Sequence, residues 1–338
     1  MTATHRPGPL NTIADVPGIL VGSAEDLSIR TGATVVLPSV RAVAAVDVRG
    51  GGPGTRETDL LAPENLVDAV DAIALAGGSV YGLAAADGVV SSLGAQGKGF
   101  VIAPGLKTAP IVPGAILFDL ANGGDKDWGE EPPYRALGKA ALAAVSTDVR
   151  MGSVGAGTGA MAGLLKGGLG SASIRLPGGG VVGALSAANS HGSMIMPGTR
   201  TFWAWPWEID GEFGGARPPA DYAADPFDWG LSKTNPTPRG NTTIAVVATD
   251  VALTPAQAKR VAVMAQDGLS RAIRPVHTPF DGDCVFVLST GARLLADPAP
   301  VTLTILGAAA ADCLARATAR GVFEARALAG ERTYADLA

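Results

Sequence analysis

The sequence predicts an α+β protein, because its strand-like and helix-like segments occur in runs instead of in strict alternation. In the first 50 residues, short apolar segments at 19–21, 34–37 and 42–48 are separated by turn residues, as in successive β-strands. Later, the capping-box sequence Thr254-Pro255-Ala256-Gln257 precedes apolar residues spaced by three and four, which predicts an amphipathic helix. The chain has 338 residues, of which 47% are hydrophobic, so it can bury a sizeable core.

The remaining elements of the N-terminal half follow from glycine and small residues. The opening strands stop at Gly50-Gly51-Gly52-Pro53-Gly54, which predicts a sharp loop. Small-residue stretches at 80–93 and 134–145 predict helices packed closely on a sheet, and 115–120 between them is strand-like. The next segment, 152–185, is so dense in glycine that its pattern gives no assignment.

The chain changes character at residues 203–240, which hold four of the five tryptophans and end in KTNPTPRGN. This composition predicts an ordered, aromatic-anchored start that becomes an exposed linker. Apolar runs at 244–248 and 284–288 predict buried strands, and 301–319 combines a β-branched start with an alanine-rich helical end. Without an internal repeat, we expect one domain over residues 1–338. The helix after Thr254 presents the apolar face Ala258, Val261, Ala262, Ala265, Leu269 and Ala272.

Charge and composition argue against several classes of partner. The net charge is −5 and no cluster of Lys and Arg is present, so neither nucleic acid nor an anionic membrane surface is an expected partner. The N-terminal residues lack the pattern of a secretory signal, and the uncharged stretches 72–86 and 151–165 are short and glycine-rich, so no membrane span is expected. Two cysteines define neither a disulfide framework nor a metal site, which favours a cytoplasmic protein.

Common catalytic motifs are missing. No serine has glycine at both flanking positions of a nucleophile elbow, and the three histidines lack the spacing of a metalloprotease. Gly155-x-Gly157-x-x-Ala160 resembles a dinucleotide fingerprint, but no clear strand precedes it and position 180 is glycine. We therefore expect neither a cofactor nor a metal.

The segment Gly240-Asn241-Thr242-Thr243-Ile244 lies where the linker meets a buried strand. If the chain were cut before Thr242, the threonine would carry both a hydroxyl nucleophile and an α-amine that acts as its base, since that amine has a pKa of about 7.7 to 8.0. The same residues also fit an ordinary strand that begins with β-branched residues after a loop.

Three further positions could support such chemistry, and each has an ordinary alternative. In an extended Asp281-Gly282-Asp283 both carboxylates face one side and could hold an ammonium group, or they form a polar turn. Lys166 is isolated in an uncharged stretch, so it either lines a cleft or extends from an apolar face to solvent. Asn189 offers an amide donor for an oxyanion, or it caps a turn.

Together these segments resemble the N-terminal-nucleophile hydrolases of the D-aminopeptidase/β-aminopeptidase group, which include the nylon oligomer (6-aminohexanoate oligomer) endo-hydrolases. The resemblance implies an αββα sandwich and self-cleavage between Asn241 and Thr242, giving an α-chain of residues 1–241 and a β-chain of residues 242–338. The matching stretches are GNTTI at 240–244, HTPFDGDCVF at 277–286, the GAGTG region leading to Lys166, the Asn189 region, TGATVV at 31–36 and LAGGSVYGL at 75–83.

The resemblance also assigns roles. Thr242 is the implied nucleophile, Lys166 and Asn189 are implied oxyanion stabilisers near it, and Asp281 and Asp283 match carboxylates that position the threonine amine and hydroxyl. The family implies a homo-oligomer, a dimer or tetramer of αβ units.

For substrate contact we expect Phe118 and Tyr81. Phe118 stands where the nylon oligomer hydrolases carry a tyrosine, so a phenolic hydroxyl is missing, and the tryptophan-rich insertion at 203–229 is unusual for that group. The implied activity is hydrolysis of linear amides, either aminohexanoate oligomers or short peptides and amino-acid amides. The alternatives are a threonine-dependent acyltransferase and an uncleaved, non-catalytic binding homologue.

Overall fold

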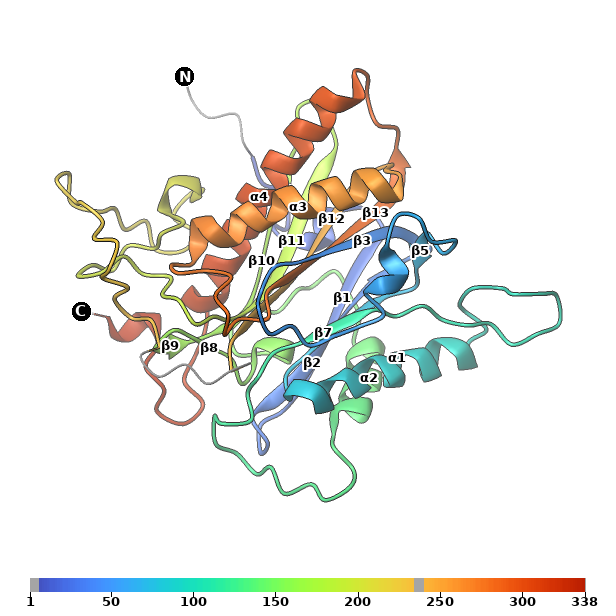
Figure 1. Cartoon of the computed structure of the whole chain (residues 1–338), viewed down its shortest axis with the longest axis horizontal. Helices are drawn as coiled ribbons and strands as arrows, with labels where there is room; N and C mark the ends of the chain where they lie inside the picture. Colours follow the sequence, from blue (N-terminus) through green and yellow to red (C-terminus); the bar gives the residue numbers. More distant parts are fainter. Residues whose placement is uncertain (1–5, 234–239, 338) are drawn as a thin grey trace.

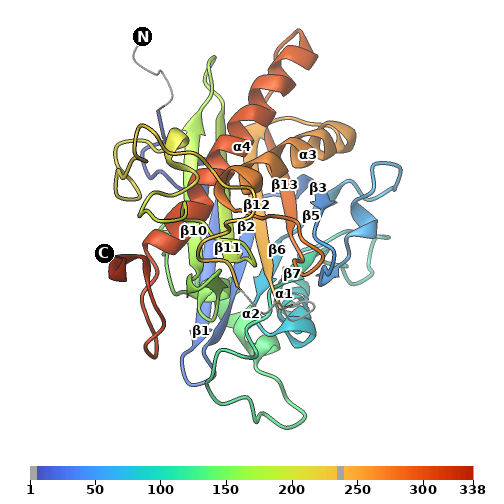
Figure 2. The same cartoon turned by 60° about the vertical axis from the view of Figure 1, so that its left-hand side comes forward.

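Two β-sheets packed face to face, with helices on both outer sides, form the core of the protein (Figure 1). The computed structural model describes residues 6–233 and 240–337. The first sheet has the order β1-β2-β6-β7-β4 and is covered by α1 and α2. The second sheet has the order β10-β11-β12-β13-β3-β5 and is covered by α3 and α4 (Figure 2). The predicted αββα sandwich is confirmed.

The elements run along the chain as follows. The strands are β1 (Ile19–Asp26), β2 (Thr31–Pro38), β3 (Ala42–Val48), β4 (Thr55–Arg56), β5 (Ala69–Val70), β6 (Ile73–Ala76), β7 (Gly114–Ile116), β8 (Met161–Ala162), β9 (Leu165–Lys166), β10 (Gly168–Arg175), β11 (Val181–Asn189), β12 (Thr242–Val251) and β13 (Cys284–Arg293). The α-helices are α1 (Ala84–Ala95), α2 (Tyr134–Ala143), α3 (Pro255–Ala272) and α4 (Ala299–Phe323).

The middle of the second sheet is fully buried, and its residues alternate between two hydrophobic cores. In β12, Ile244 and Val246 face the first sheet, whereas Ala245 and Val247 face α3 and α4. β12 pairs antiparallel with β11, where Asn189 lies opposite Thr242, and parallel with β13, where Cys284 lies opposite Ile244. The start of β12 is therefore fixed on both sides.

Most predicted elements are confirmed, with three differences. The predicted strand at 115–120 is shorter, since β7 ends at Ile116. The predicted helix at 80–93 begins as a 3-10 turn, Ser79–Leu83, before α1. The β-branched start of 301–319 is helical along with the rest of α4, because Pro300 occupies its first turn and Val301 and Ile305 are exposed, so no sheet packing holds them as a strand. In α3 the capping box at Thr254 is present and all six predicted apolar residues are buried.

The glycine-dense stretch that resisted assignment forms the short β8-β9 pair and the hairpin of β10 and β11. Its glycines let α4 approach the sheet. A Cβ atom on Gly170 would lie 2.1 Å from the carbonyl oxygen of Ala317, and one on Gly168 would lie 2.3 Å from that of Gly321. The glycines are thus helix-packing positions within buried strands.

By length and composition, α4 could cross a membrane, which the sequence did not suggest for this segment. About 56% of its most apolar window is buried, and the helix packs against α3, β10 and β11. This burial is typical of a core helix in a folded domain.

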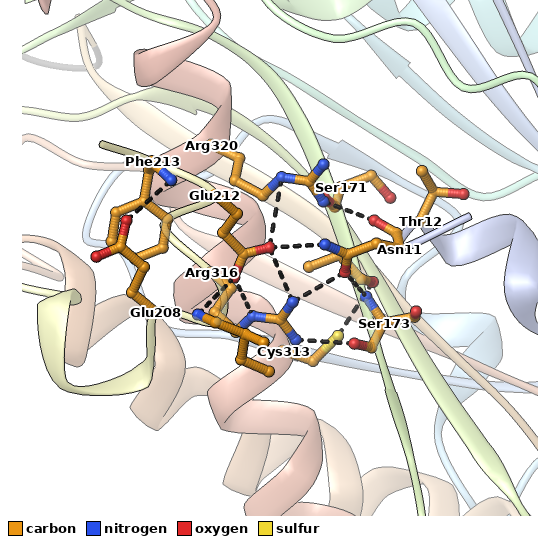
Figure 3. A network of polar contacts seen from close by, with 12 residues as sticks. Asn11, Thr12, Ser171, Ser173, Glu208, Glu212, Phe213, Cys313, Arg316 and Arg320 are labelled. Carbon is orange, nitrogen blue, oxygen red and sulfur yellow. Dashed lines mark hydrogen bonds and ion pairs between the residues drawn. The ribbon is translucent and has the colours of Figure 1, made fainter. Parts of the chain in front are cut away.

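The tryptophan-rich segment is ordered in its described part and is anchored on α4 by a buried polar network (Figure 3). Arg316 of α4 donates from Nη2 to Oε2 of Glu212 at 2.8 Å, from Nη1 to the carbonyl oxygen of Ser173 at 2.8 Å, and from Nη2 to Oδ1 of Asn11 at 2.8 Å. Burial alone would raise the pKa of Glu212, but the hydrogen bonds and charge of Arg316 hold it below its usual value. Residues 234–239 of the predicted linker lie outside the described part.

Candidate active site

The carbonyl group that precedes Thr242 is held by two donors. Its oxygen, on Asn241, accepts a hydrogen bond from the N–H of Gly282 at 2.9 Å and another from the hydroxyl of Thr242. Thr242 is the first residue of β12 and only 2% exposed. A hydroxyl therefore lies beside a peptide carbonyl whose oxygen already has a main-chain donor in place.

Glycines allow the loops around this junction to come together. A Cβ atom on Gly282 would lie 2.8 Å from Oγ1 of Thr242, and one on Gly50 would lie 2.3 Å from the backbone nitrogen of Asp283. The N–H of Gly52 also donates to the carbonyl oxygen of Asp281 at 2.7 Å. The predicted glycine loop thus packs directly against the 281–283 segment.

Both carboxylates of that segment are buried beside the junction. Asp283 accepts from the N–H of Thr243 at 2.7 Å and from Nδ1 of His277 at 2.9 Å. Asp281 accepts from the N–H of His191 at 3.0 Å and from the N–H of Thr278 at 3.1 Å. Burial, and then the negative charge of Asp283, raise the pKa of Asp281. Neither carboxylate is hydrogen-bonded to Thr242 in the described, uncut chain.

Asn189 reaches the junction from β11. Its Nδ2 donates to the carbonyl oxygen of Phe118 at 3.0 Å and, over a longer 3.4 Å, to that of Gly240. Its Oδ1 accepts from the N–H of Met161 at 2.9 Å. The longer bond ties Asn189 to the residue just before the Asn241-Thr242 pair.

Lys166 is 1% exposed and organises the neighbouring loop. Its Nζ donates to the carbonyl oxygens of Ala160 at 2.9 Å, Gly167 at 3.0 Å and Gly157 at 3.4 Å. Burial lowers the pKa of Lys166 to about 8. In the described chain its donors are directed to these carbonyls and not to Thr242.

This pKa predicts how Lys166 affects stability. Between pH 8 and the usual lysine pKa of 10.5, the unfolded chain keeps the proton that the folded chain loses, so the stability of the protein rises with pH. As the pH rises through this window, the free energy of unfolding of the chain with Lys166 should increase relative to that of the Lys166→Met variant by up to about 1.4 kcal/mol per pH unit. Urea unfolding at pH 7 to 10, with both chains carrying Thr242→Ala, measures the difference. A difference that stays constant between pH 8 and 10 would contradict the prediction.

A cavity of about 190 Å³ opens in front of the junction. Of the two residues predicted to contact substrate, Phe118 lies in the lining of this cavity and Tyr81 does not: the Tyr81 ring is 46% exposed and packs edge-on against Trp128. The residues lining the cavity are Phe118, Asp119, Ala121, Asn122, Gly159, Met161, Asn189, Lys233, Gly240 and Asn241.

Asp119 is a buried acid in this lining that the sequence reasoning missed. Its carboxylate accepts from the hydroxyl of Thr31 at 2.7 Å and from the N–H of Gly78 at 2.7 Å, and burial raises its pKa. The TGATVV and LAGGSVYGL stretches therefore meet at one side chain. The available sequence signal was an acidic residue directly after the apolar run 115–118.

Lys233 was also missed, and nothing in its local sequence marks it. Its Nζ donates to Oδ1 of Asn241 at 2.7 Å, and burial of the ammonium lowers the pKa of Lys233 to about 8.

Among the described residues, no three His, Cys, Asp or Glu side chains gather in a way that could hold a metal ion. A larger cavity, about 690 Å³, lies away from this chemistry, beside Trp207 and Arg316.

Comparison with known proteins agrees with this architecture. The model of peptidase family S58 matches residues 11–335. An uncharacterized aminopeptidase of Mycobacterium bovis is 47% identical over 97% of this chain and 98% of its own. A 6-aminohexanoate-oligomer endohydrolase of a Kocuria species is 33% identical over 82% of this chain and 74% of its own.

Solved structures share the fold. A beta-aminopeptidase of a Burkholderia species has a TM-score of 0.70 at 24% identity, covering 95% of this chain and 89% of its own. The L-aminopeptidase D-Ala-esterase/amidase of Ochrobactrum anthropi, described as a variant of the Ntn hydrolase fold, has a TM-score of 0.67 at 22% identity, covering 96% and 89%. With the family model matching almost the whole chain, the protein belongs to peptidase family S58 and is a hydrolase of amide or peptide bonds.

Proposed function

We propose that the protein cuts itself between Asn241 and Thr242 and then uses Thr242 as an N-terminal nucleophile to hydrolyse linear amides. The observation that carries the proposal is the junction itself. The buried hydroxyl of Thr242 contacts the preceding carbonyl, and the N–H of Gly282 is bonded to that carbonyl oxygen at 2.9 Å.

Self-cleavage would proceed in two steps. Oγ1 of Thr242 attacks the carbonyl carbon of Asn241, the C–N bond to Thr242 breaks, and the hydroxyl proton passes to the departing nitrogen. Water then hydrolyses the resulting ester, leaving a carboxylate on Asn241 and a free amine on Thr242. The N–H of Gly282 stabilises the negative charge on the oxygen during the attack.

In turnover the freed amine takes the proton as Oγ1 attacks the substrate carbonyl, and water releases the acyl group. Asn189 supplies an oxyanion donor. Once the chain end that carries Gly240 moves away after the cut, the Nδ2 hydrogen that was bonded to the Gly240 carbonyl oxygen becomes available. Asp281 and Asp283 favour the protonated amine, whereas the cations of Lys166 and Lys233 oppose it. Opposing charges of this kind keep the pKa of the amine near neutral pH.

The substrates we propose are linear amides that carry a free amine. Asp119 gives the cavity an acidic group that suits an ammonium, and relatives are named as aminopeptidases and as 6-aminohexanoate-oligomer endohydrolases. Phe118 offers an apolar wall without a hydroxyl, which suits methylene chains. We further propose a homo-oligomer of αβ units.

Intact mass under denaturing conditions tests the proposal. The wild-type chain of 33.8 kDa should give fragments of about 24 and 10 kDa, in proportion to 241 and 97 residues. The cut protein should release amine from an amino-acid amide or a 6-aminohexanoate oligomer, but not from its N-acetylated form. A single 33.8 kDa species that hydrolyses these substrates would overturn the N-terminal threonine mechanism. Product analysis with and without an added amine separates the acyltransferase alternative, which needs the amine as acceptor, whereas the hydrolase forms the acid in water alone.

A further inference from the structure

The side chain of Asn241, the residue just before the proposed cut, is held by a lysine. Nζ of Lys233 lies 2.7 Å from Oδ1 of Asn241, whereas Nδ2 of Asn241 is buried and has no hydrogen-bond partner among the described residues. An ammonium group has only donors, so it fixes the oxygen of the amide toward itself. This bond to Lys233 therefore sets the orientation of the Asn241 side chain.

Lys233 itself lies on an anchored piece of backbone. The N–H of Lys233 donates to the carbonyl oxygen of His191 at 3.0 Å. The residue before it, Ser232, accepts from the N–H of Ser193 at 2.9 Å and donates to the carbonyl oxygen of Trp229 at 2.7 Å. The lysine is thus tied to the same 190–193 loop that Asp281 contacts.

Asn241 is consequently held at two points. The N–H of Gly282 holds its main-chain oxygen and Lys233 holds its side chain, on either side of the carbonyl carbon that Thr242 would attack. Two fixed points restrict rotation of the peptide group relative to Oγ1 of Thr242. Restricting such rotation matters, because misplacing reacting atoms by about 1 Å can cost about 100-fold in rate.

We propose that Lys233 is a positioning residue for self-cleavage and acts through the side chain of Asn241. The proposal rests on the proposed self-cleavage. It gives Lys233 a role that the sequence did not suggest. It also explains why the buried side chain of Asn241 is hydrogen-bonded through Oδ1 alone.

A double-mutant cycle on the rate of cleavage tests this role. Freshly refolded or newly synthesised chain is followed by denaturing electrophoresis and intact mass. Lys233→Met, which keeps the length of the side chain but removes its donor, should slow cleavage about 10- to 100-fold. Asn241→Leu should slow it to a similar degree, and adding Lys233→Met to Asn241→Leu should change the rate less than about twofold. Lys233→Arg, which keeps a donor, should restore most of the rate.

Lys259→Met is the matched control. Lys259 likewise donates hydrogen bonds from its Nζ, in this case to the carbonyl oxygen of Val46 and to Oδ1 of Asp47, but it lies on α3 and outside the cavity lining. Its replacement should leave the cleavage rate unchanged. Equal slowing by Lys233→Met in the wild-type chain and in the Asn241→Leu chain would overturn the proposal, as would a Lys233→Met rate within about twofold of wild type.

Two further outcomes distinguish failure of the proposed function from failure of the role of Lys233. A wild-type chain that never cuts defeats the proposed function itself, whereas normal cutting by Lys233→Met defeats only the role of Lys233. If Lys233→Met does not fold, slow cutting by Asn241→Leu together with fast cutting by Lys233→Arg supports the proposal, and the reverse pattern overturns it.

Discussion

Replacing Thr242 with alanine is expected to leave the chain in one 33.8 kDa piece and to abolish amide hydrolysis. The substitution removes the hydroxyl that lies beside the Asn241 carbonyl, so neither the ester nor the free amine can form. Loss of a nucleophile of this kind lowers kcat by at least about 10³-fold and up to about 10⁶-fold. Intact mass and release of amine from a 6-aminohexanoate oligomer measure the two losses separately.

Two neighbouring substitutions make the Thr242 result specific. Thr242→Ser keeps a hydroxyl at the same position and should still cut and hydrolyse. Thr243→Val removes the next hydroxyl, which is buried without a hydrogen-bond partner in the described chain, and should leave both activities in place. Hydrolysis at the wild-type rate by the Thr242→Ala protein would rule out Thr242 as the nucleophile.

The second large effect concerns stability. Arg316→Met is expected to lower the free energy of unfolding by about 3–5 kcal/mol, because it removes the hydrogen-bonded counter-ion of the buried Glu212 carboxylate and leaves only the longer 3.7 Å ion pair with Arg320. The same change removes donors to the carbonyl oxygen of Ser173 and to Oδ1 of Asn11 (Figure 3). Three distant segments therefore lose one of the two arginines of α4 that join them and keep only the contacts of Arg320.

Urea unfolding in the Thr242→Ala background measures this effect on a single chain. Arg56→Met breaks the ion pair with Asp87, in which the two side chains are 32% and 49% exposed, so the cost should stay below about 1 kcal/mol. Equal costs for Arg316 and Arg56 would show that the buried network adds no more stability than an exposed ion pair.

Much of the fold could be predicted from local pattern. The capping box at Thr254 and the spacing of apolar residues define α3, and the apolar runs at 244–248 and 284–288 mark the two central strands. The hydroxyl at the start of β12 was likewise visible, since a strand that begins directly after a proline-rich linker is a local feature. These signals depend only on neighbours in sequence.

The rest depends on contacts between distant segments. Asp119 becomes part of the site only because Thr31 and Gly78 converge on it, and Lys233 only because the 190–193 loop anchors its backbone. The glycines of β10 look like loop residues until α4 is placed against them. Tyr81 was predicted to contact substrate because it lies in the LAGGSVYGL stretch, but its ring packs against Trp128 and lies outside the cavity lining.

The position of β12 has a consequence for the lifetime of the protein. After a cut before Thr242, the second sheet would be shared by two molecules, with β3, β5, β10 and β11 from the longer piece and β12 and β13 from the shorter. Neither piece holds the whole of this sheet, so renaturation would require two chains to meet and would depend on their concentration. An intact precursor would fold in a unimolecular reaction, whereas a processed form, once unfolded, would not readily return. Its durability would then be governed by the rate of unfolding and not by an equilibrium.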